Sequence, residues 1–369
     1  MQPSQEPAVS RTDDRVEPAA ALLVEVNRGQ ITESRHRGHI AAVDGTGKLI
    51  ASLGDPATVT YLRSSAKPFQ AIPLLVSGAA DRFGFTEEEV ALACASHSGE
   101  PIHVELAKSM LQKIGLEPSA LKCGVHDPFS VAETRKLREQ GQPANVLQNN
   151  CSGKHAGMLA LALQLGAETG SYDEPRNPVQ LAIQKTVAGF CDCSDEKLAV
   201  GVDGCGVPVF GMPITSMALM YARLVSPSNP QANSPTNVDE QTTDACRRIV
   251  KAMADHPELI GGTTERLDTE IMRAAKGRLI SKVGAEGVYT VGVLPCKDWP
   301  SGLGLALKIE DGDDSRARPT VVIEALRQLG VLRDDSLDSL SQFSRFPVKN
   351  RRADVVGEVR AYFKLERKD

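Results

Sequence analysis

Hydrophobic residues near the start of the chain are spaced as in β-strands. A first apolar run covers residues 21–30, and two more, HIAAV and KLIASL, flank Asp44-Gly45-Thr46-Gly47. Short apolar runs that end in Gly- and Asp-rich pairs are typical of strands joined by tight turns. This pattern therefore predicts an antiparallel sheet at the beginning of the chain.

From Ser64 onward the hydrophobic spacing becomes helical. Phe69, Ile72 and Leu75 recur as on one helix face, and Pro68 stands where the first turn tolerates it. We therefore expect a helix that begins at Ser64 or the next residue, with serine as its N-cap. The same spacing predicts helices at 87–94 (capped by Thr86), 103–114, 152–165, 178–190, 214–224 and 239–254.

Strand patterns return in the last third of the chain. They occupy residues 198–204, 278–284, 288–294 and 302–312, and a helix at 318–329 precedes a last strand at 356–365. The fold class is therefore α+β, with an antiparallel sheet built from both chain ends and a helical lobe inserted between them. We expect a disordered tail at 1–20 and one domain at 21–369, with its sheet lobe at 21–63 and 278–369 and its helical lobe at 64–277. The Pro-, Asn- and Ser-rich stretch at 225–241 predicts a long surface loop.

Composition narrows the classes of function. The 369 residues carry a formal charge of −5, so no basic surface favours nucleic acid as a partner. No apolar run approaches the roughly 18 residues of a membrane span. The eight cysteines are too sparse for a disulfide framework, and no secretory segment is recognisable before them. We expect a cytoplasmic protein with reduced thiols and no membrane partner.

Three short motifs carry groups suited to nucleophilic chemistry. Ser64 and Lys67 are three residues apart, so on a helix the amine can reach the hydroxyl and take its proton. Ser96, in the S-x-S of a loop between two helices, is a candidate proton shuttle, and Lys282 of a K-x-G ends a predicted strand. The alternative for each motif is a helix cap, an ordinary loop or a solvated lysine. Their order resembles the S-x-x-K, S-x-N and K-T-G motifs of penicillin-binding proteins and serine β-lactamases.

Two Gly-rich turns contain cysteine. Cys151 precedes Lys154 and His155 in NNCSGKHAGM, and Cys205 lies in VDGCGVP. Thiolates are zinc ligands, so the two turns suggest a metal site. The alternative is that both thiols are ordinary buried residues, and without a C-x-x-C pair the zinc signal is weak.

The longer motifs together identify a family. RSSAKPFQ, CASHSGE, CGVHDP, NNCSGKHAGML, VDGCGVPVFGMP and SKVGAEGVY closely resemble segments of the rhizobial-type (class 3) bacterial L-asparaginases. The resemblance implies hydrolysis of L-asparagine to L-aspartate and ammonia, a fold similar to serine β-lactamases and glutaminases, and a homodimer. It also implies a Zn²⁺ site formed by Cys151, Lys154 and Cys205, and a second essential pair, Ser96 and Lys282.

The residues can then be given expected roles. Ser64 is our choice of nucleophile with Lys67 as its base, at the positive end of a helix, although attack by Ser96 stays open. Three further residues are expected to bind substrate: Arg63 at the α-carboxylate, Asp203 at the α-ammonium, and His155 beside substrate or water.

The metal has two candidate roles. Lys154 must lose its proton to bind zinc, which would then either polarise water or grip the substrate. The serine pairs favour gripping, because they make a metal-bound nucleophile redundant.

Three other functions compete with an asparaginase. One is a zinc-dependent hydrolase of another small amino acid amide such as glutamine, in which Ser and Lys only bind substrate. Another is a silent amino-acid-binding protein, which the intact nucleophile and base disfavour. A penicillin-interacting enzyme is less favoured, because no export signal is seen and the intervening motifs differ.

Overall fold

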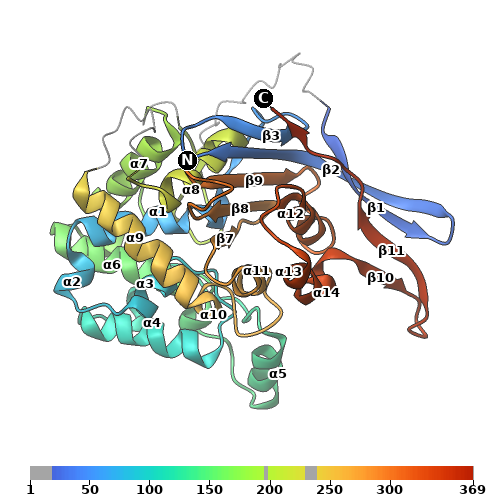
Figure 1. Ribbon diagram of the computed structural model, residues 1–369. Coiled ribbons are helices and arrows are strands. Elements are labelled where there is room, and N and C mark those ends of the chain that lie inside the picture. The colour runs from blue at the N-terminus through green and yellow to red at the C-terminus, as the bar shows by residue number, and fades with distance from the viewer. Residues whose placement is uncertain (1–18, 195–197, 229–238, 369) are drawn as a thin grey trace, which may run out of the picture.

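A nine-stranded antiparallel sheet takes strands from both ends of the chain (Figure 1). The computed structural model describes residues 19–194, 198–228 and 239–368. The main path is β10-β11-β1-β2-β9-β8-β7, and β3 pairs with β2 and β12. These strands are β1 (Ala21–Arg28), β2 (Ile31–Asp44), β3 (Leu49–Leu53), β7 (Leu279–Val283), β8 (Val288–Val293), β9 (Leu303–Ile309), β10 (Phe346–Lys349), β11 (Val355–Ala361) and β12 (Glu366–Arg367). The predicted α+β architecture, with an antiparallel sheet from both ends, is confirmed.

The predicted tight turn joins β2 to β3. Asp44 Oδ1 accepts the backbone N–H groups of Thr46 at 2.8 Å and Lys48 at 3.0 Å. Gly47 has φ +92°, which residues with a side chain rarely adopt. The Asp-Gly-Thr-Gly sequence therefore closes this hairpin as expected.

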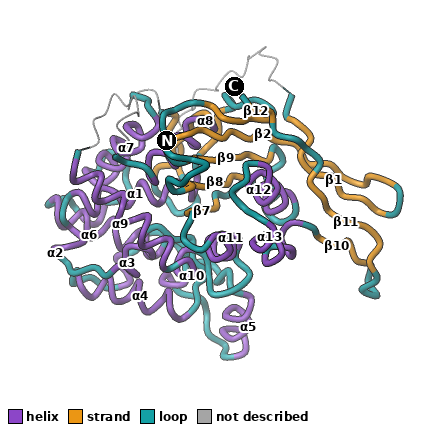
Figure 2. Tube along the Cα trace, viewed as in Figure 1, coloured by secondary structure: helices purple, strands orange, loops and turns teal. Residues whose placement is uncertain are grey.

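Helices form the second part of the molecule (Figure 2). They are α1 (Lys67–Val76), α2 (Ala79–Arg82), α3 (Glu87–Ala93), α4 (Pro101–Lys113), α5 (Val131–Glu139), α6 (Ser152–Leu165), α7 (Pro178–Cys191), α8 (Ile214–Val225), α9 (Glu240–Asp255), α10 (Pro257–Ile260) and α11 (Leu267–Ala275). Three more, α12 (Ala317–Gln328), α13 (Asp334–Ser339) and α14 (Ser341–Ser344), follow β9. All the predicted helices are present within a few residues, and Thr86 caps α3 in a capping box.

The serine cap predicted for α1 is wrong. A 3₁₀ turn, η1 (Arg63–Ala66), precedes α1, and neither Leu62 nor Ala66 at the two N-cap positions makes a side-chain cap hydrogen bond. The buried Ser65 hydroxyl donates instead to the carbonyl of Lys282 at 3.1 Å. This bond ties the start of the helix to β7, so the serine serves a tertiary contact rather than a cap.

A small second sheet was not predicted. Its order is β4-β6-β5, with β4 (Val59–Tyr61), β5 (Ala199–Val202) and β6 (Pro208–Pro213). Of these strands, the sequence predicted only the run that contains β5. The sheet places the segment after β4 beside the turn that joins β5 to β6, which is where candidate site residues lie.

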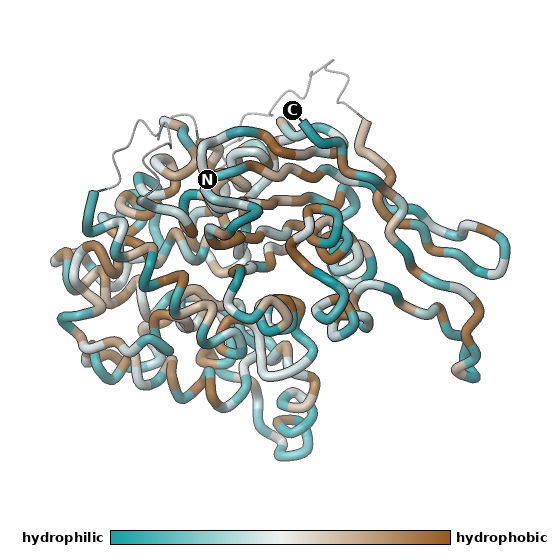
Figure 3. The backbone as a smooth tube through the Cα atoms, viewed as in Figure 1, coloured by the Kyte–Doolittle hydropathy of each residue, from teal (hydrophilic) through white to brown (hydrophobic). Residues whose placement is uncertain are grey.

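The core lies where helices meet the main sheet, and the central strands there are largely hydrophobic (Figure 3). Helix α8 packs against β2, β8 and β9. Gly304 permits this approach, because a Cβ atom there would lie 1.7 Å from the carbonyl oxygen of Ala218. Within the ranges given above, no helix has the length and apolar character needed to cross a membrane.

Two predicted segments fall mainly outside the described residues. The expected tail at 1–20 has only its last two residues in the described part, and residues 229–238 of the expected loop at 225–241 lie outside it. These two predictions, and the division into lobes, stay predictions.

Candidate active site

The hydroxyl of Ser96 lies between two lysine amines. Lys67, the first residue of α1, has its Nζ 2.9 Å from Ser96 Oγ, and Nζ of Lys282 on β7 is 2.8 Å away. Ser96 follows α3 and is 2% exposed. The structure thus brings together three of the four predicted catalytic residues, from three separate elements.

The hydrogen bonds assign a proton arrangement. Lys67 Nζ also contacts the carbonyl oxygens of Ala95 at 2.6 Å and Asn150 at 3.2 Å, so three acceptors match the three N–H groups of an ammonium. Ser96 Oγ accepts from Lys67, and it can donate to Lys282 only when that amine is neutral. Burial lowers the pKa of Lys282 to about 7, so its amine can be neutral near neutral pH.

Ser64 lies at the edge of this group. It belongs to η1, is half-buried, and its Oγ has no hydrogen-bond partner among the described residues. The predicted hydrogen bond to Lys67 is therefore not formed, because the Lys67 amine is engaged by Ser96. Ser64 nevertheless has the more accessible hydroxyl of the two serines.

Arg63 and Asp203 form an ion pair beside Ser64. Arg63 Nε donates to Asp203 Oδ1 at 2.9 Å, and the small sheet brings them together because β4 precedes Arg63 and the β5–β6 turn contains Asp203. Burial acts to raise the pKa of Asp203, but Lys154, the Gly204 amide and Arg63 hold it below its ordinary value. The pair offers one positive and one negative group to a zwitterion.

Backbone strain marks the same position. Arg63 has φ +52°, a conformation that side-chain-bearing residues seldom adopt. Such strain is stored where surrounding contacts fix it, often at functional sites. The turn aims Arg63 at Asp203 and leaves Ser64 beside it.

The predicted metal-binding residues also come together. Cys151 is the N-cap residue of α6, and Lys154 Nζ on that helix donates to Cys205 Sγ at 2.9 Å. A hydrogen bond with Cys205 lowers the pKa of Cys151 well below its usual value, despite burial. Burial alone would lower the pKa of Lys154, but the two thiols raise it.

The three donors fit the coordination chemistry of zinc. Two sulfur atoms and one amine nitrogen converge from two turns, and these are donors that Zn²⁺ accepts once the amine is neutral. In the part of the chain that the structure describes, no group of three His, Cys, Asp or Glu side chains forms a metal site. The predicted set differs from such a group because its third member is a lysine.

His155 lies next to this cluster and is fully buried. Its Nδ1 is 2.7 Å from the Tyr172 hydroxyl, which also accepts the backbone N–H of Lys122 at 2.8 Å. Tyr172 therefore donates to Nδ1, which assigns the proton to Nε2. That nitrogen has no hydrogen-bond partner among the described residues, and burial lowers the pKa of His155 to about 4. The neutral ring thus lies beside the Cys205 thiol.

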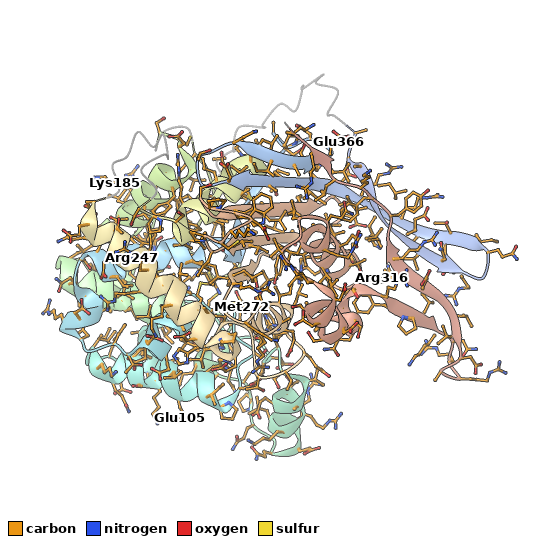
Figure 4. The ribbon with its side chains drawn as sticks, in the orientation of Figure 1. Glu105, Lys185, Arg247, Met272, Arg316 and Glu366 are labelled. Carbon is orange, nitrogen blue, oxygen red and sulfur yellow. The ribbon has the colours of Figure 1, made fainter. Side chains whose placement is uncertain are left out.

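Other residues at the site were not singled out from the sequence. Asn150 contributes a carbonyl oxygen to Lys67, and Arg266 donates to the backbone oxygen of Ser96 at 2.9 Å. Asp268 lies 3.8 Å from Lys282. Helix α11, where Figure 4 labels Met272, carries Asp268 and packs against β7. No sequence signal separates Arg266 and Asp268 from ordinary surface charges.

A family model described as L-asparaginase II matches residues 24–361. No curated protein matches the chain.

Several solved structures resemble the chain. One is a probable glutaminase from Bacillus subtilis complexed with 6-diazo-5-oxo-L-norleucine, with 13% identity, a TM-score of 0.39 and coverage of 80% of this chain and 86% of that one. Another is a covalent complex between a Bacillus subtilis glutaminase and 5-oxo-L-norleucine, with 12% identity, a TM-score of 0.41 and coverage of 80% and 89%. A third is a Bacillus glutaminase in 4.3 M NaCl, with 13% identity, a TM-score of 0.37 and coverage of 80% and 92%.

Proposed function

We propose that the substrate of this protein is L-asparagine. The chain belongs to the L-asparaginase II family and is an amidohydrolase of asparagine or glutamine. The products are L-aspartate and ammonia. The family predicted from the motifs is confirmed, whereas the choice of substrate and the roles of residues are our proposal. The observation that carries the mechanism is the position of Ser96 Oγ between Lys67 and Lys282.

Ser64 is the nucleophile in this proposal, and Ser96 is a proton relay. A nucleophile must touch substrate. Ser64 is half-buried and its hydroxyl has no hydrogen-bond partner in the described part of the chain, whereas Ser96 is buried and bonded to both amines. Although Ser64 and Lys67 are not hydrogen-bonded here, catalytic contacts often tighten only when substrate binds. The spacing of three residues along η1 and α1 keeps Lys67 within reach.

The proton transfers balance along one chain of groups. Lys67 passes a proton to Ser96 as Ser96 passes its own proton to Lys282, and the lone pair freed on Lys67 takes the proton of Ser64 as Ser64 Oγ attacks the carboxamide carbon. The reverse transfer protonates the departing nitrogen, so ammonia leaves and an ester on Ser64 remains. Water then cleaves the ester, and aspartate and free Ser64 are regenerated.

Arg63 and Asp203 bind the two charges of the free amino acid. The α-carboxylate of the substrate binds the Arg63 guanidinium, and its α-ammonium binds the Asp203 carboxylate. The substrate thus replaces the ion pair between Arg63 and Asp203. His155 donates from Nε2 to substrate or water. A capped amino acid would leave one member of the pair without a counter-charge.

Zinc is proposed at Cys151, Lys154 and Cys205, the residues whose donors fit it. When bound, the zinc ion would act as a Lewis acid that binds an oxygen atom of the substrate. The protein contributes two thiolates and a deprotonated Lys154 amine, and Asn150 links this cluster to the relay, because its carbonyl accepts from Lys67 and Cys151 follows it.

We also propose that the protein is a cytoplasmic homodimer. The family resemblance supports the dimer. The eight cysteines, all free, support a reducing compartment. Sedimentation at several concentrations tests the dimer, and a mass near that of one chain would contradict it.

One assay tests the proposed function. Ammonia release is measured with L-asparagine, L-glutamine and D-asparagine, on zinc-loaded enzyme and on the Ser64→Ala variant as control. We expect kcat/KM to be highest for L-asparagine and turnover to be lost in the variant. Faster turnover of L-glutamine would identify the alternative, a glutaminase.

A further inference from the structure

Asp268 is a buried carboxylate aimed at the second lysine of the relay. It is the second residue of α11 and is 1% exposed. Its Oδ2 lies 3.8 Å from Lys282 Nζ, and it is the one carboxylate within 4.0 Å of that nitrogen in the described part of the chain. Neither Asp268 oxygen makes a close hydrogen bond within those residues, and the buried Tyr289 hydroxyl of β8 faces the same carboxylate. An isolated buried carboxylate is costly unless a cation compensates it.

The other charges around Lys282 come from several elements. Lys67 at the start of α1 and Arg266 just before α11 disfavour a further positive charge, whereas Asp268 and the more distant thiol of Cys151 favour one. Lys282 itself is fully buried. The balance between the neutral and the protonated form of Lys282 therefore depends strongly on Asp268.

We infer that Asp268 is a positioning residue that supplies the counter-charge for Lys282 when that amine takes the proton of Ser96. The inference rests on the proposed function, because it concerns the last step of its proton relay. Before the transfer Lys282 is neutral and bonded to Ser96 at 2.8 Å, and the Asp268 carboxylate stands 3.8 Å away. After it, Lys282 is an ammonium with an N–H to donate, and the carboxylate of Asp268 is its nearest anion.

The expected effects follow from electrostatics. An opposite charge at this distance raises the pKa of a lysine by about one to three units. Removal of the carboxylate therefore makes the protonated form of Lys282 less accessible, and kcat should fall by at least about tenfold with little change in KM. The pKa of Lys282, about 7 with Asp268 present, should also decrease.

The direction of the pH effect separates this role from a structural one. Lys282 must be neutral to accept a proton, so activity is lost as the pH falls through its pKa. This loss forms the acid limb of the pH profile of kcat. In Asp268→Asn the acid limb should move to lower pH, and the plateau value of kcat should decrease. A variant whose fold is merely destabilised would lose activity without a shift of the acid limb.

The test compares four proteins over pH 5–9 with L-asparagine: wild type, Asp268→Asn, Asp268→Glu and Asp314→Asn. Asp314 lines the same cavity of about 240 Å³ as Asp268, and its carboxylate accepts the backbone N–H of Gly287, a bond that asparagine retains. We expect Asp314→Asn to keep the wild-type kcat and pH limb. Asp268→Glu should recover part of the kcat that Asp268→Asn loses.

The outcomes distinguish the inference from the proposed function. An inactive wild type with every amide would overturn the proposed function. An active wild type beside a folded Asp268→Asn with unchanged kcat and unchanged acid limb would overturn only the role of Asp268. If Asp268→Asn does not fold, Asp268→Ser takes its place, and a folded Asp268→Ser with the kcat and acid limb of wild type overturns the role as well.

Discussion

Lys67 Nζ is hydrogen-bonded at 2.9 Å to the hydroxyl of Ser96, which is 29 positions away in the chain, and not to Ser64, three residues before it. The S-x-x-K motif therefore does not act as a closed pair in this structure. Its lysine is bonded instead to Ser96, whose hydroxyl also lies 2.8 Å from Lys282 Nζ. The two serines therefore differ in their contacts with Lys67, and we expect substitutions of Ser64 and of Ser96 to have different effects.

Capping either charge of the substrate should abolish efficient turnover. Arg63 and Asp203 are paired at 2.9 Å without substrate, and N-acetyl-L-asparagine has no ammonium to offer Asp203. A site built to pair a buried group rejects an analogue that leaves it unpaired. We expect kcat/KM for the acetylated compound to be lower by about 100-fold or more. The measurement is ammonia release at several concentrations of each compound, and comparable rates would indicate a peptidase-like site.

Removing zinc should affect KM more than kcat. If the ion at Cys151, Lys154 and Cys205 grips substrate, chelated enzyme and Cys205→Ala should bind asparagine weakly yet retain appreciable kcat at saturation. Cys246→Ala is the matched control, because that thiol is buried in α9 and is not among the proposed ligands.

Metal content and thermal midpoint should be measured on the same samples. A collapse of kcat at every substrate concentration would show that zinc generates the attacking hydroxide instead. A folded, metal-free enzyme with the wild-type KM would show that the metal has no part in binding substrate.

His97 should make stability depend on acid pH. Its Nδ1 accepts the N–H of Gly99 at 3.1 Å, and its Nε2 bonds to Ser152 Oγ at 2.9 Å, so the folded protein needs the neutral ring. Burial lowers the pKa of His97 well below its ordinary value of about 6.5. As the pH falls below about 6.5, the unfolded chain binds a proton that the folded chain does not, and the free energy of unfolding decreases.

The variant His97→Asn keeps an acceptor for Gly99 but does not titrate. We expect its free energy of unfolding, from urea titrations between pH 7 and 5, to decrease less steeply than that of wild type. The difference in slope should approach about 1.4 kcal/mol per pH unit. Equal slopes in the two proteins would mean that His97 does not contribute.

Local patterns predicted most elements but not their contacts. The capping box of Thr86 and the Asp44 turn depend on residues within a few positions, and both are found as expected. The strand β4 was missed because it has only three residues, and β6 was missed because Pro and Gly interrupt its apolar run. Both become strands only within the sheet β4-β6-β5. Their pairing brings Arg63 to Asp203 across 140 positions.

The site was predicted in part for the same reason. Ser96 and Lys282 are 186 positions apart, and only the order of the motifs and the family resemblance linked them. Asp268, within the charged segment ERLDTE, looks like an ordinary residue in the first turn of a surface helix. Its burial depends on how α11 packs against β7, which no local spacing encodes.

In the proposed mechanism Ser64 attacks substrate while Ser96 relays the proton. A diazo ketone analogue of L-asparagine is incubated with wild type, Ser64→Ala, Ser65→Ala and Ser96→Ala, and the labelled residue is located by mass spectrometry of peptides. We predict a label on Ser64 in wild type and Ser65→Ala, slower labelling of the same residue in Ser96→Ala, and none in Ser64→Ala. A label on Ser96 of the wild-type protein would contradict the account.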